Sequence, residues 1–399
     1  MSDPADLNPA DSNKAELEKP SLDKSNLVKI SLDKLKSCRD DIDALDNEML
    51  QLISRRALLA REIGALKDDG VIYRPEREAQ VLRRLTSLNA GPLSAEAVTH
   101  IFRGIMSNCR ALEKELTIAF LGPLGTFSEE AANKQFGGLS APIQCSSIDE
   151  VFRQVETGQA DYGVVPVENS TEGAVGHTLD LLMQTNLKVC GEIELPVHHC
   201  LISAAKNIAD IKTVYSHSQS LGQCNGWLNK NLPNVRREAK VSNSDAVKFI
   251  AKPGSDNSGS DISGLDVLGS AAIASKRAAE LFGVNILVEN IEDDPKNTTR
   301  FLVLSQHAVA FSGNDKTSLV MATKNVPGAM LALLEPLAKH GVSLTKFESR
   351  PSKIGLWEYI FFMDIEGHFQ DEKVAVAVKE IENRASFLKV LGSYPVALV

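Results

Sequence analysis

The stretch from Thr117 to Ala132 reads TIAFLGPLGTFSEEAA, and it decides the fold of the middle of the chain. Its opening TIAFL suits a buried β-strand, because it is short, mostly apolar and followed by turn residues. The glycine-rich GPLG that comes next predicts a turn, and the residues after it predict a helix. A strand, a turn and a helix in this order are typical of an α/β domain.

Other strand patterns further along the chain extend this α/β domain. The runs YGVVPV from Tyr162, KTVYSH from Lys212 and TRFLVL from Thr299 read as strands, with helical stretches between them. We therefore predict an α/β domain over residues 117–308. The polar Gly/Ser stretch Lys252–Gly264 inside it predicts a mobile loop.

The first 116 residues divide into a tail, 1–30, and a helical segment, 31–116. The tail is rich in Asp, Lys, Ser, Asn and Pro, which predicts disorder. From Leu35 onward apolar residues recur at spacings of three and four, which predicts one long helix. Pro75 opens a second helix, and Ser94 is a suitable N-cap for a third. We expect the long helix to pack against a second copy of the chain, because helices of such unequal length do not readily form a compact monomer.

The last segment, residues 317–395, alternates strand, helix, strand, strand, helix and strand. TSLVMA from Thr317 is the first strand. A helix is predicted from Asn325 to His340, with Asn325 as its cap and Gly341 just past its end. This βαββαβ order predicts a ferredoxin-like fold.

Composition and charge exclude several classes of function. The formal net charge is -9, whereas a nucleic-acid-binding protein needs an excess of Lys and Arg to neutralise phosphates. No run reaches the ~18 apolar residues that a membrane-spanning helix needs, and the first residues lack the apolar core of a secretory signal. The six cysteines show no paired spacing, which favours free thiols in a reducing compartment. We therefore expect a cytoplasmic protein that binds neither nucleic acid nor membrane.

Charged residues stand where the helical pattern of the first segment predicts apolar ones. Arg56 falls within the apolar seam of the long helix, and Arg39 and Lys67 border that seam. Glu78 and Glu113 are in line with the apolar faces of the second and third helices. One such charge alone is best explained by an ion pair across a dimer interface. Five together indicate a site for a small anionic ligand, since an unpaired buried charge is very costly.

This segment resembles the all-helical class of chorismate mutases, over about Leu35–Leu116. The resemblance rests on CRDDIDALD, RRALLAREIGALK and RPERE. It implies a substrate site formed by Arg39 (from a partner subunit) and Arg56 on the two carboxylates of chorismate, Lys67 and Glu113 on the ether oxygen, and Glu78 on the ring hydroxyl, with Arg74 and Cys109 beside them. Arg74 replaces a more usual Asp and Cys109 a more usual Ser. The rearrangement needs positioning and electrostatic stabilisation rather than a cofactor.

Glu113 stands where other members of this class have Gln, and Lys67 and Glu113 are the predicted catalytic residues of the mutase. A carboxyl must be protonated before it can donate a hydrogen bond to the ether oxygen. We therefore predict that mutase activity falls as the pH rises through the titration of Glu113.

Polar clusters stand beside the strand ends of the α/β domain, where open sheets bind ligands. Each cluster alone is explained by turn and cap chemistry. Together they resemble prephenate dehydratase, most recognisably in the triplet TRF from Thr299. The resemblance implies a two-lobed domain of the periplasmic-binding-protein type. It also implies a substrate site formed by Thr126, Ser128, Glu168, Asn169, Ser170, Thr171, Ser216, Gln223, Thr299 and Arg300.

The implied reaction removes carboxylate and hydroxide from prephenate and aromatises the ring. Thr299 is the predicted catalytic residue, since it can assist departure of the ring hydroxyl, and Arg300 is expected near a carboxylate. Assistance by a general acid is worth about 10²–10⁴-fold. The contiguous His198-His199-Cys200 lacks the separated ligand pairs of structural zinc, so no metal is expected. A structural hydrogen bond explains His217 at least as well as a catalytic role.

The C-terminal segment resembles an ACT domain. The resemblance implies a phenylalanine site formed by Gly328, Ala329, Met330 and Leu331 together with Glu348, Ser349, Arg350 and Pro351. Met330 replaces a more usual Leu or Val. A helix N-terminus is a suitable partner for the carboxylate of the ligand. The alternative is a small structural dimerisation module.

Taken together, the three segments are similar to the bifunctional chorismate mutase/prephenate dehydratase family. The resemblance implies conversion of chorismate to prephenate, and of prephenate to phenylpyruvate, CO2 and water, with inhibition by phenylalanine. A homodimer or higher assembly without a cofactor is expected. Two alternatives are a dehydratase whose mutase segment is only a dimerisation arm, and a non-catalytic small-molecule-binding protein.

Overall fold

A computed structural model describes residues 24–66, 71–138, 140–251, 269–323, 326–351 and 359–397, with side chains from Leu32 onward. Residues 1–23 of the predicted tail, Lys67, the predicted loop Lys252–Gly264 and Asn325 lie outside the described residues. The chain divides into two compact units, Met1–Leu59 and Ala60–Val399.

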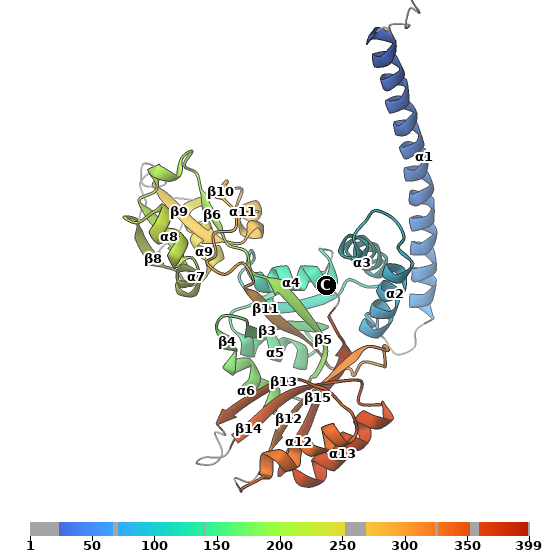
Figure 1. Ribbon diagram of the computed structural model, residues 1–399, viewed down its shortest axis with the longest axis vertical. Helices are drawn as coiled ribbons and strands as arrows, with labels where there is room; N and C mark the ends of the chain where they lie inside the picture. The colour runs from blue at the N-terminus through green and yellow to red at the C-terminus, as the bar shows by residue number, and fades with distance from the viewer. Residues whose placement is uncertain are drawn as a thin grey trace, which may run out of the picture. The chain divides into compact units, whose positions relative to one another are not determined.

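Helix α1 extends over Lys24–Ala65 and is the long blue helix of Figure 1. It begins earlier than the predicted Leu35 and takes in the end of the predicted tail, where Lys and Leu favour a helix. Its apolar face is exposed within the unit Met1–Leu59. The exposed side chains are Leu35, Ile42, Leu45, Met49, Leu52 and Leu59.

Helices α2 (Pro75–Leu88) and α3 (Ala95–Ala111) begin where the sequence predicts. Pro75 occupies the first turn of α2, where its missing N–H costs nothing. The side chain of Ser94 accepts a hydrogen bond from the backbone N–H of Ala97 (3.1 Å) and caps α3. The two helices pack against each other.

The predicted two-lobed α/β domain is confirmed. The sheet of its first lobe has the order β2-β1-β3-β11-β5, and the short β4 pairs with β3. Strands β1, β2 and β3 are parallel, whereas β11 is antiparallel to both of its neighbours. The elements are β1 (Thr117–Leu121), α4 (Phe127–Phe136), β2 (Ala141–Cys145), α5 (Ile148–Glu156), β3 (Tyr162–Asn169), β4 (Gly173–Ala174), α6 (Gly176–Gln184), β5 (Lys188–Pro196) and β11 (Thr298–Ser305).

The sheet of the second lobe has the order β10-β6-β9-β7-β8. The chain enters this lobe after β5 and leaves it before β11, so two segments connect the lobes. The elements are β6 (Cys200–Ser203), η1 (Ile208–Asp210), β7 (Thr213–Ser216), α7 (Ser218–Gln223), α8 (Asn225–Asn231), β8 (Arg236–Ala239), α9 (Asn243–Ala251), β9 (Ser270–Ala274), α11 (Lys276–Phe282) and β10 (Ile286–Val288).

The C-terminal sheet has the order β13-β14-β12-β15, which confirms the ferredoxin-like prediction. Its helix α12 begins at Ala329 rather than at the predicted Asn325. The reason is that Gly328 takes the N-cap position with φ of 80°, which no right-handed helix continues through. The elements are β12 (Asp315–Ala322), α12 (Ala329–Lys339), β13 (Leu344–Pro351), β14 (Tyr359–Glu366), α13 (Glu372–Arg384) and β15 (Phe387–Pro395).

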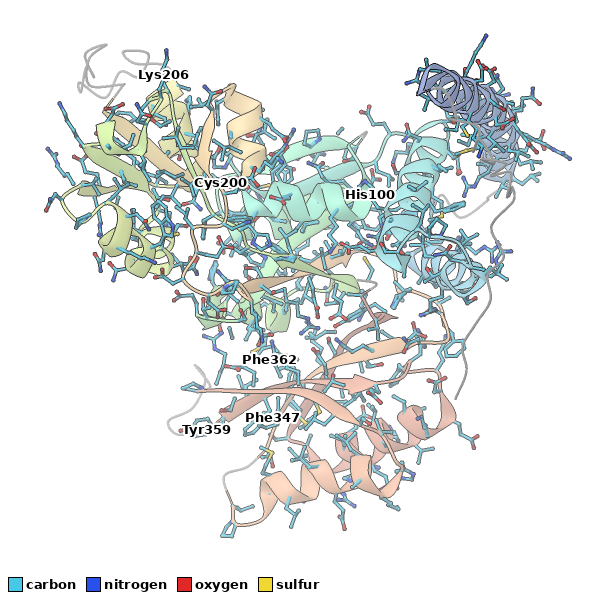
Figure 2. All side chains as sticks on the ribbon, turned by 45° about the horizontal axis from the view of Figure 1, so that its top comes forward. His100, Cys200, Lys206, Phe347, Tyr359 and Phe362 are labelled. Carbon is cyan, nitrogen blue, oxygen red and sulfur yellow. The ribbon has the colours of Figure 1, made fainter. Side chains whose placement is uncertain are left out.

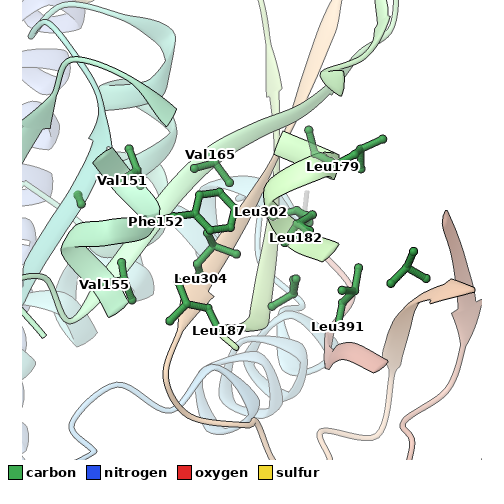
Figure 3. Packing of buried hydrophobic residues seen from close by; sticks show 14 of the residues in the cluster. Val151, Phe152, Val155, Val165, Leu179, Leu182, Leu187, Leu302, Leu304 and Leu391 are labelled. Atoms are coloured by element: carbon green, nitrogen blue, oxygen red, sulfur yellow. The ribbon is translucent and has the colours of Figure 1, made fainter. Parts of the chain in front are cut away.

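One hydrophobic core joins the C-terminal sheet to the first lobe. Leu302 and Leu304 of β11 belong to the same cluster as Val320, Ile360 and Leu391 of the C-terminal sheet, and Figure 3 shows part of it. The opposite face of the C-terminal sheet packs against α12 and α13. Strand β11 therefore contributes to the first lobe and touches the C-terminal domain.

Candidate functional site

A cavity of about 340 Å³ lies between the two lobes. The predicted dehydratase residues that line it are Thr126, Ser128, Asn169, Gln223 and Thr299. Phe127, His199 and His217 line it as well. The predicted residues that lie outside its wall are Glu168, Ser170, Thr171, Ser216 and Arg300.

The N-termini of several helices line this cavity. Lining residues stand at the start of four helices: Thr126 at α4, His217 at α7, Asn243 at α9 and Ser275 at α11. The backbone N–H groups and the dipole of a helix N-terminus favour anions. Within the described ranges no Lys or Arg lines the cavity. The helix ends are therefore the groups of this wall that favour an anion.

The turn before α4 connects the two lobes closely. Gly125 has φ of +84°, and a Cβ added there would lie 2.7 Å from Ser244 Oγ and 3.2 Å from Ala278 Cα of the second lobe. The hydroxyls of Ser244 and Ser275 donate to the backbone carbonyls of Leu124 and Gly125. Only glycine permits this approach, which explains the glycine-rich turn that follows β1.

Asn169 and Thr299 face each other on the antiparallel strands β3 and β11. Asn169 Nδ2 donates to Thr299 Oγ1 and to Asn297 Oδ1, at 2.8 Å each. Asn169 Oδ1 accepts the backbone N–H groups of Thr171 (3.1 Å) and Glu172 (3.2 Å). Since these N–H groups can only donate, the amide of Asn169 has one possible orientation. Among the described residues the Thr299 hydroxyl has no acceptor of its own.

Ser170 and Ser216 make hydrogen bonds at the strand ends beside the cavity. Ser170 exchanges hydrogen bonds with Thr298: its N–H donates to the Thr298 carbonyl (2.9 Å), and its hydroxyl accepts the Thr298 N–H (3.0 Å). The buried Ser216 hydroxyl lies 2.7 Å from the Ile273 carbonyl and 2.8 Å from Asn243 Oδ1. Both serines therefore support the wall of the cavity without lining it.

Gln223 and His199 form the opposite wall. Gln223 Nε2 donates to Thr171 Oγ1 (3.3 Å), and Gln223 Oε1 lies 3.0 Å from His199 Nε2. The backbone N–H of His199 donates to Glu292 (2.8 Å), and its ring packs edge-to-face with the ring of Phe127, with 5.5 Å between the ring centroids. His199 is fully buried, and this burial lowers its pKa. His199 is difficult to recognise from the sequence, because two adjacent histidines suggest metal ligands sooner than a side chain that holds Gln223 by a hydrogen bond.

Arg300 and Glu168 point away from the cavity, toward the C-terminal domain. The guanidinium of Arg300 lies 2.7 Å from Glu192 and 2.7 Å from Asp364 of β14. The carboxylate of Glu168 contacts the ammonium of Lys346 on β13. This placement differs from the predicted one, because successive side chains of a strand point to opposite faces. Thr299 and Arg300 therefore cannot line the same cavity wall.

The predicted mutase residues are distributed over both units. Arg39 and Arg56 lie on α1 within Met1–Leu59, with Arg39 exposed and Arg56 half-buried. Lys67 lies outside the described residues. Arg74 occupies the N-cap position of α2, 3.9 Å from Glu76.

Glu78 is buried between α2 and α3. Its carboxylate lies 2.7 Å from the guanidinium of Arg110 and 3.5 Å from that of Arg103. Arg110 also covers the ring of the buried Tyr73 at 4.6 Å. Neither arginine was predicted from the sequence, although their spacing of seven places both on one face of α3.

Cys109 and Glu113 lie at the end of the same segment. Cys109 is buried in α3. Glu113 packs against Gly64 near the end of α1, where an added Cβ would lie 2.7 Å from Glu113 Cγ and Oε2. Gly64 therefore gives the Glu113 side chain access to the helix backbone.

The two predicted effector motifs lie on α12 and β13. Gly328 caps α12, and Leu331 in its first turn is exposed. Glu348, Ser349, Arg350 and Pro351 end the edge strand β13. Arg350 donates to the carbonyl of Gly176 and lies 3.0 Å from Asp180, both in α6 of the first lobe. Phe347 and Tyr359, labelled in Figure 2, stand exposed on the sheet and stack on Phe361.

Two other kinds of site have no counterpart in the described part of the chain. No group of three His, Cys, Asp or Glu side chains there is arranged to hold a metal ion. No helix in the described ranges combines the length and the apolar character that crossing a membrane requires.

Family models match all three segments. They are chorismate mutase type II over residues 38–114, prephenate dehydratase over 118–309 and the ACT domain over 317–383. A bifunctional chorismate mutase/prephenate dehydratase of Neisseria gonorrhoeae is 50% identical, over 90% of this chain and 97% of the relative. The bifunctional chorismate mutase/prephenate dehydratase of Escherichia coli is 34% identical, over 90% of this chain and 96% of the relative.

Two solved prephenate dehydratases align with most of this chain. Prephenate dehydratase from Arthrobacter aurescens in complex with L-Phe aligns with a TM-score of 0.62 and 32% identity, over 70% of this chain and 90% of that chain. Prephenate dehydratase from Staphylococcus aureus aligns with a TM-score of 0.56 and 25% identity, over 70% of this chain and 100% of that chain. Both catalytic segments are therefore present, against the alternatives of an inactive mutase arm or a non-catalytic binding protein. The chain belongs to the family of bifunctional chorismate mutase/prephenate dehydratases, with both activities of phenylalanine biosynthesis and an ACT domain.

Proposed function

We propose that prephenate binds in the cavity between the two lobes and that Thr299 donates a hydrogen bond to its departing hydroxyl. The observation that carries this role is the fixed amide of Asn169, which occupies the oxygen of Thr299 and leaves its O–H to donate. The N-termini of the surrounding helices receive the carboxylates of the substrate. Asn169 and Gln223 line the cavity as the other polar contacts, and Thr171 hydrogen-bonds both of them. Ser170 and Ser216 support the neighbouring strand ends.

We propose that the mutase site is completed in a dimer. The exposed apolar face of α1 supports this assembly, since a long apolar seam is stabilised by a second helix. Arg39 of one subunit would join Arg56, Lys67, Glu78 and Glu113 of its partner around chorismate. Arg74 and Cys109 stand beside this set.

We propose that phenylalanine binds between the start of α12 and the end of β13. The exposed Leu331 and the edge position of β13 support a site at the surface of the domain, where a second copy can complete it. Residues 317–395 then form the regulatory domain, residues 31–116 the mutase and residues 117–308 the dehydratase. We place the enzyme in the cytoplasm, a reducing compartment that suits six free cysteines.

The decisive experiment follows phenylpyruvate formation by purified protein. Chorismate and prephenate are supplied separately, each with and without phenylalanine. Turnover of both substrates, with prephenate turnover reduced by phenylalanine, is expected. Failure to convert prephenate would contradict the proposed role of the cavity. Failure to convert chorismate would contradict the proposed mutase site.

The role of Glu113 has its own test. Glu113→Gln supplies an amide that donates without titrating, so the mutase activity of the variant should persist to higher pH than that of the wild type. Mutase rates are measured from pH 5 to 9 in both proteins. Identical pH profiles would show that Glu113 does not donate to the ether oxygen.

A further inference from the structure

Five side chains around the cavity form one chain of hydrogen bonds. It runs from Thr299 through Asn169, Thr171 and Gln223 to His199. The members come from four places in the sequence and from both lobes. Each link is a side-chain contact of 2.6–3.3 Å.

The direction of this chain is fixed at Asn169. Its Oδ1 accepts two backbone N–H groups, so it also accepts the Thr171 hydroxyl at 2.6 Å. Because the single proton of Thr171 is used there, Thr171 Oγ1 can only accept from Gln223. Gln223 must therefore turn its nitrogen to Thr171 and its oxygen to His199. His199 must in turn carry a proton on Nε2.

We propose that His199 is a positioning residue of the dehydratase, whose Nε2–H holds the Gln223 amide with its nitrogen toward Thr171 and the cavity. This inference rests on the proposed function of the cavity. Without the hydrogen bond from His199, the amide of Gln223 can rotate, and its N–H groups no longer have a fixed direction at the cavity wall.

The same geometry excludes His199 as the proton donor of the reaction. Its Nε2 proton is directed at Gln223, and its Nδ1 is buried and has no partner among the described residues. The charged or titratable neighbours of the ring are Glu292, which accepts the His199 backbone N–H, and His198. Phe127 and Gln223, from α4 and α7, present neutral groups to the ring.

The buried ring makes stability depend on pH in one direction. Burial lowers the pKa of His199 below its ordinary value of 6.5, so the unfolded chain binds this proton more readily than the folded chain. Above pH 6.5 the ring is neutral in both states and this effect is absent. As the pH falls below 6.5, the unfolded chain takes up the proton first and the folded state loses stability. Replacement by a residue that does not titrate should remove this part of the acid slope.

The test compares His199→Leu with His199→Gln in the full-length enzyme. Gln carries an N–H at a position similar to that of Nε2 but does not titrate, whereas Leu fills space without a donor. His198→Gln serves as the matched control, because the His198 side chain is half exposed and directed at Glu292. Dehydratase kcat and KM are measured on prephenate from pH 5 to 8, and the mutase activity of each preparation reports its folding.

We expect His199→Leu to lower dehydratase kcat/KM about tenfold to hundredfold, the range for losing one buried hydrogen bond that leaves a polar group unpaired. His199→Gln should retain activity within about threefold, and His198→Gln should match the wild type. Full activity of folded His199→Leu would overturn the proposal. So would an equal loss in folded His199→Gln, because a role in packing alone predicts no rescue by the donor.

A double variant separates positioning from general damage. Thr171→Val already releases Gln223 at its other end, so adding His199→Leu should cost less than it does in the wild type. If the fold losses in kcat/KM of the two single variants multiply in the double variant, Thr171 and His199 do not act through one chain of hydrogen bonds. Thermal unfolding of His199→Gln between pH 5 and 7 should show a shallower acid slope than the wild type, and this readout does not depend on turnover. An inactive wild-type dehydratase would therefore contradict the proposed function. The pH dependence of unfolding would still show whether the buried His199 ring titrates as expected.

Discussion

The two residue pairs at the start of strand β11 have opposite surroundings. Thr299 and Asn169 face the cavity and are joined by a hydrogen bond between neutral groups. Arg300 and Glu168, one step along the same ladder, face the C-terminal sheet and are joined to it by ion pairs. We name these the cavity pair and the domain pair. One motif thus provides two contacts, one suited to chemistry and one to the attachment of the regulatory domain.

The energetics of the two pairs differ as well. The cavity pair leaves one hydroxyl proton for a substrate, and its loss should affect the reaction more than the fold. The domain pair includes Arg300, whose side chain is only 12% exposed and whose partners Glu192 and Asp364 are buried. Removing one partner of a buried ion pair leaves uncompensated charge, which costs about 3–5 kcal/mol. This distinction fails if loss of the cavity pair mainly lowers stability, or if loss of the domain pair mainly lowers the reaction rate.

Thr299→Val should have the largest effect on activity. The change removes the O–H and keeps the shape, so dehydratase kcat should fall about 10²–10⁴-fold, the range for general acid assistance. Mutase activity and thermal stability should stay near those of the wild type. Dehydratase and mutase rates on the same preparation measure the contrast.

Thr298→Val is the matched control for this variant. Thr298 is the preceding residue of β11, and its hydroxyl donates to the Lys296 carbonyl (3.2 Å) outside the cavity wall. Its dehydratase activity should change little. Similar losses in both variants would mean that damage to the strand end, rather than loss of the Thr299 donor, limits the reaction.

Arg300→Leu should have the largest effect on stability. Glu192 keeps Lys316 at 2.8 Å, but Asp364 loses its ion pair to Arg300, so unfolding free energy should fall by about 3–5 kcal/mol. The contact with the C-terminal sheet should weaken with it, and inhibition by phenylalanine should need a higher concentration. Urea unfolding and the inhibition curve of the dehydratase measure the two effects. A stable variant with a raised KM for prephenate would instead place Arg300 at the substrate.

The sequence predicted most elements of this fold because their local signals agree with the tertiary structure. Ser94 caps α3, and the strand runs at Tyr162 and Thr299 became β3 and β11. The predicted start of α12 at Asn325 was wrong, because Gly328 with its positive φ occupies the N-cap position and the helix begins at Ala329. A residue with positive φ is difficult to recognise when a plausible cap precedes it.

The candidate site was less predictable, and Arg300 shows the reason. A motif gives the identity of its residues but not the face each one occupies, although the two-residue period of a strand already separates Arg300 from Thr299. His199 was discounted as part of a metal-like trio, because only the three-dimensional chain of hydrogen bonds connects it to Gln223. Contacts between residues distant in sequence leave no local pattern to read.

Lys346→Met should have the smallest effect, and it sharpens the comparison within the domain pair. The Lys346–Glu168 ion pair is partly exposed, with side-chain exposures of 18% and 37%, so its loss should cost no more than about 1 kcal/mol. Dehydratase activity should stay within about threefold, since neither residue lines the cavity. Unfolding of Lys346→Met, Glu168→Gln and the double variant, at low and at high salt, measures the pair, because salt screens an exposed ion pair more than a buried one. If Glu168→Gln abolishes turnover while Lys346→Met does not, Glu168 belongs to the substrate site and the division of β11 and its partner strand into two functions fails at that position.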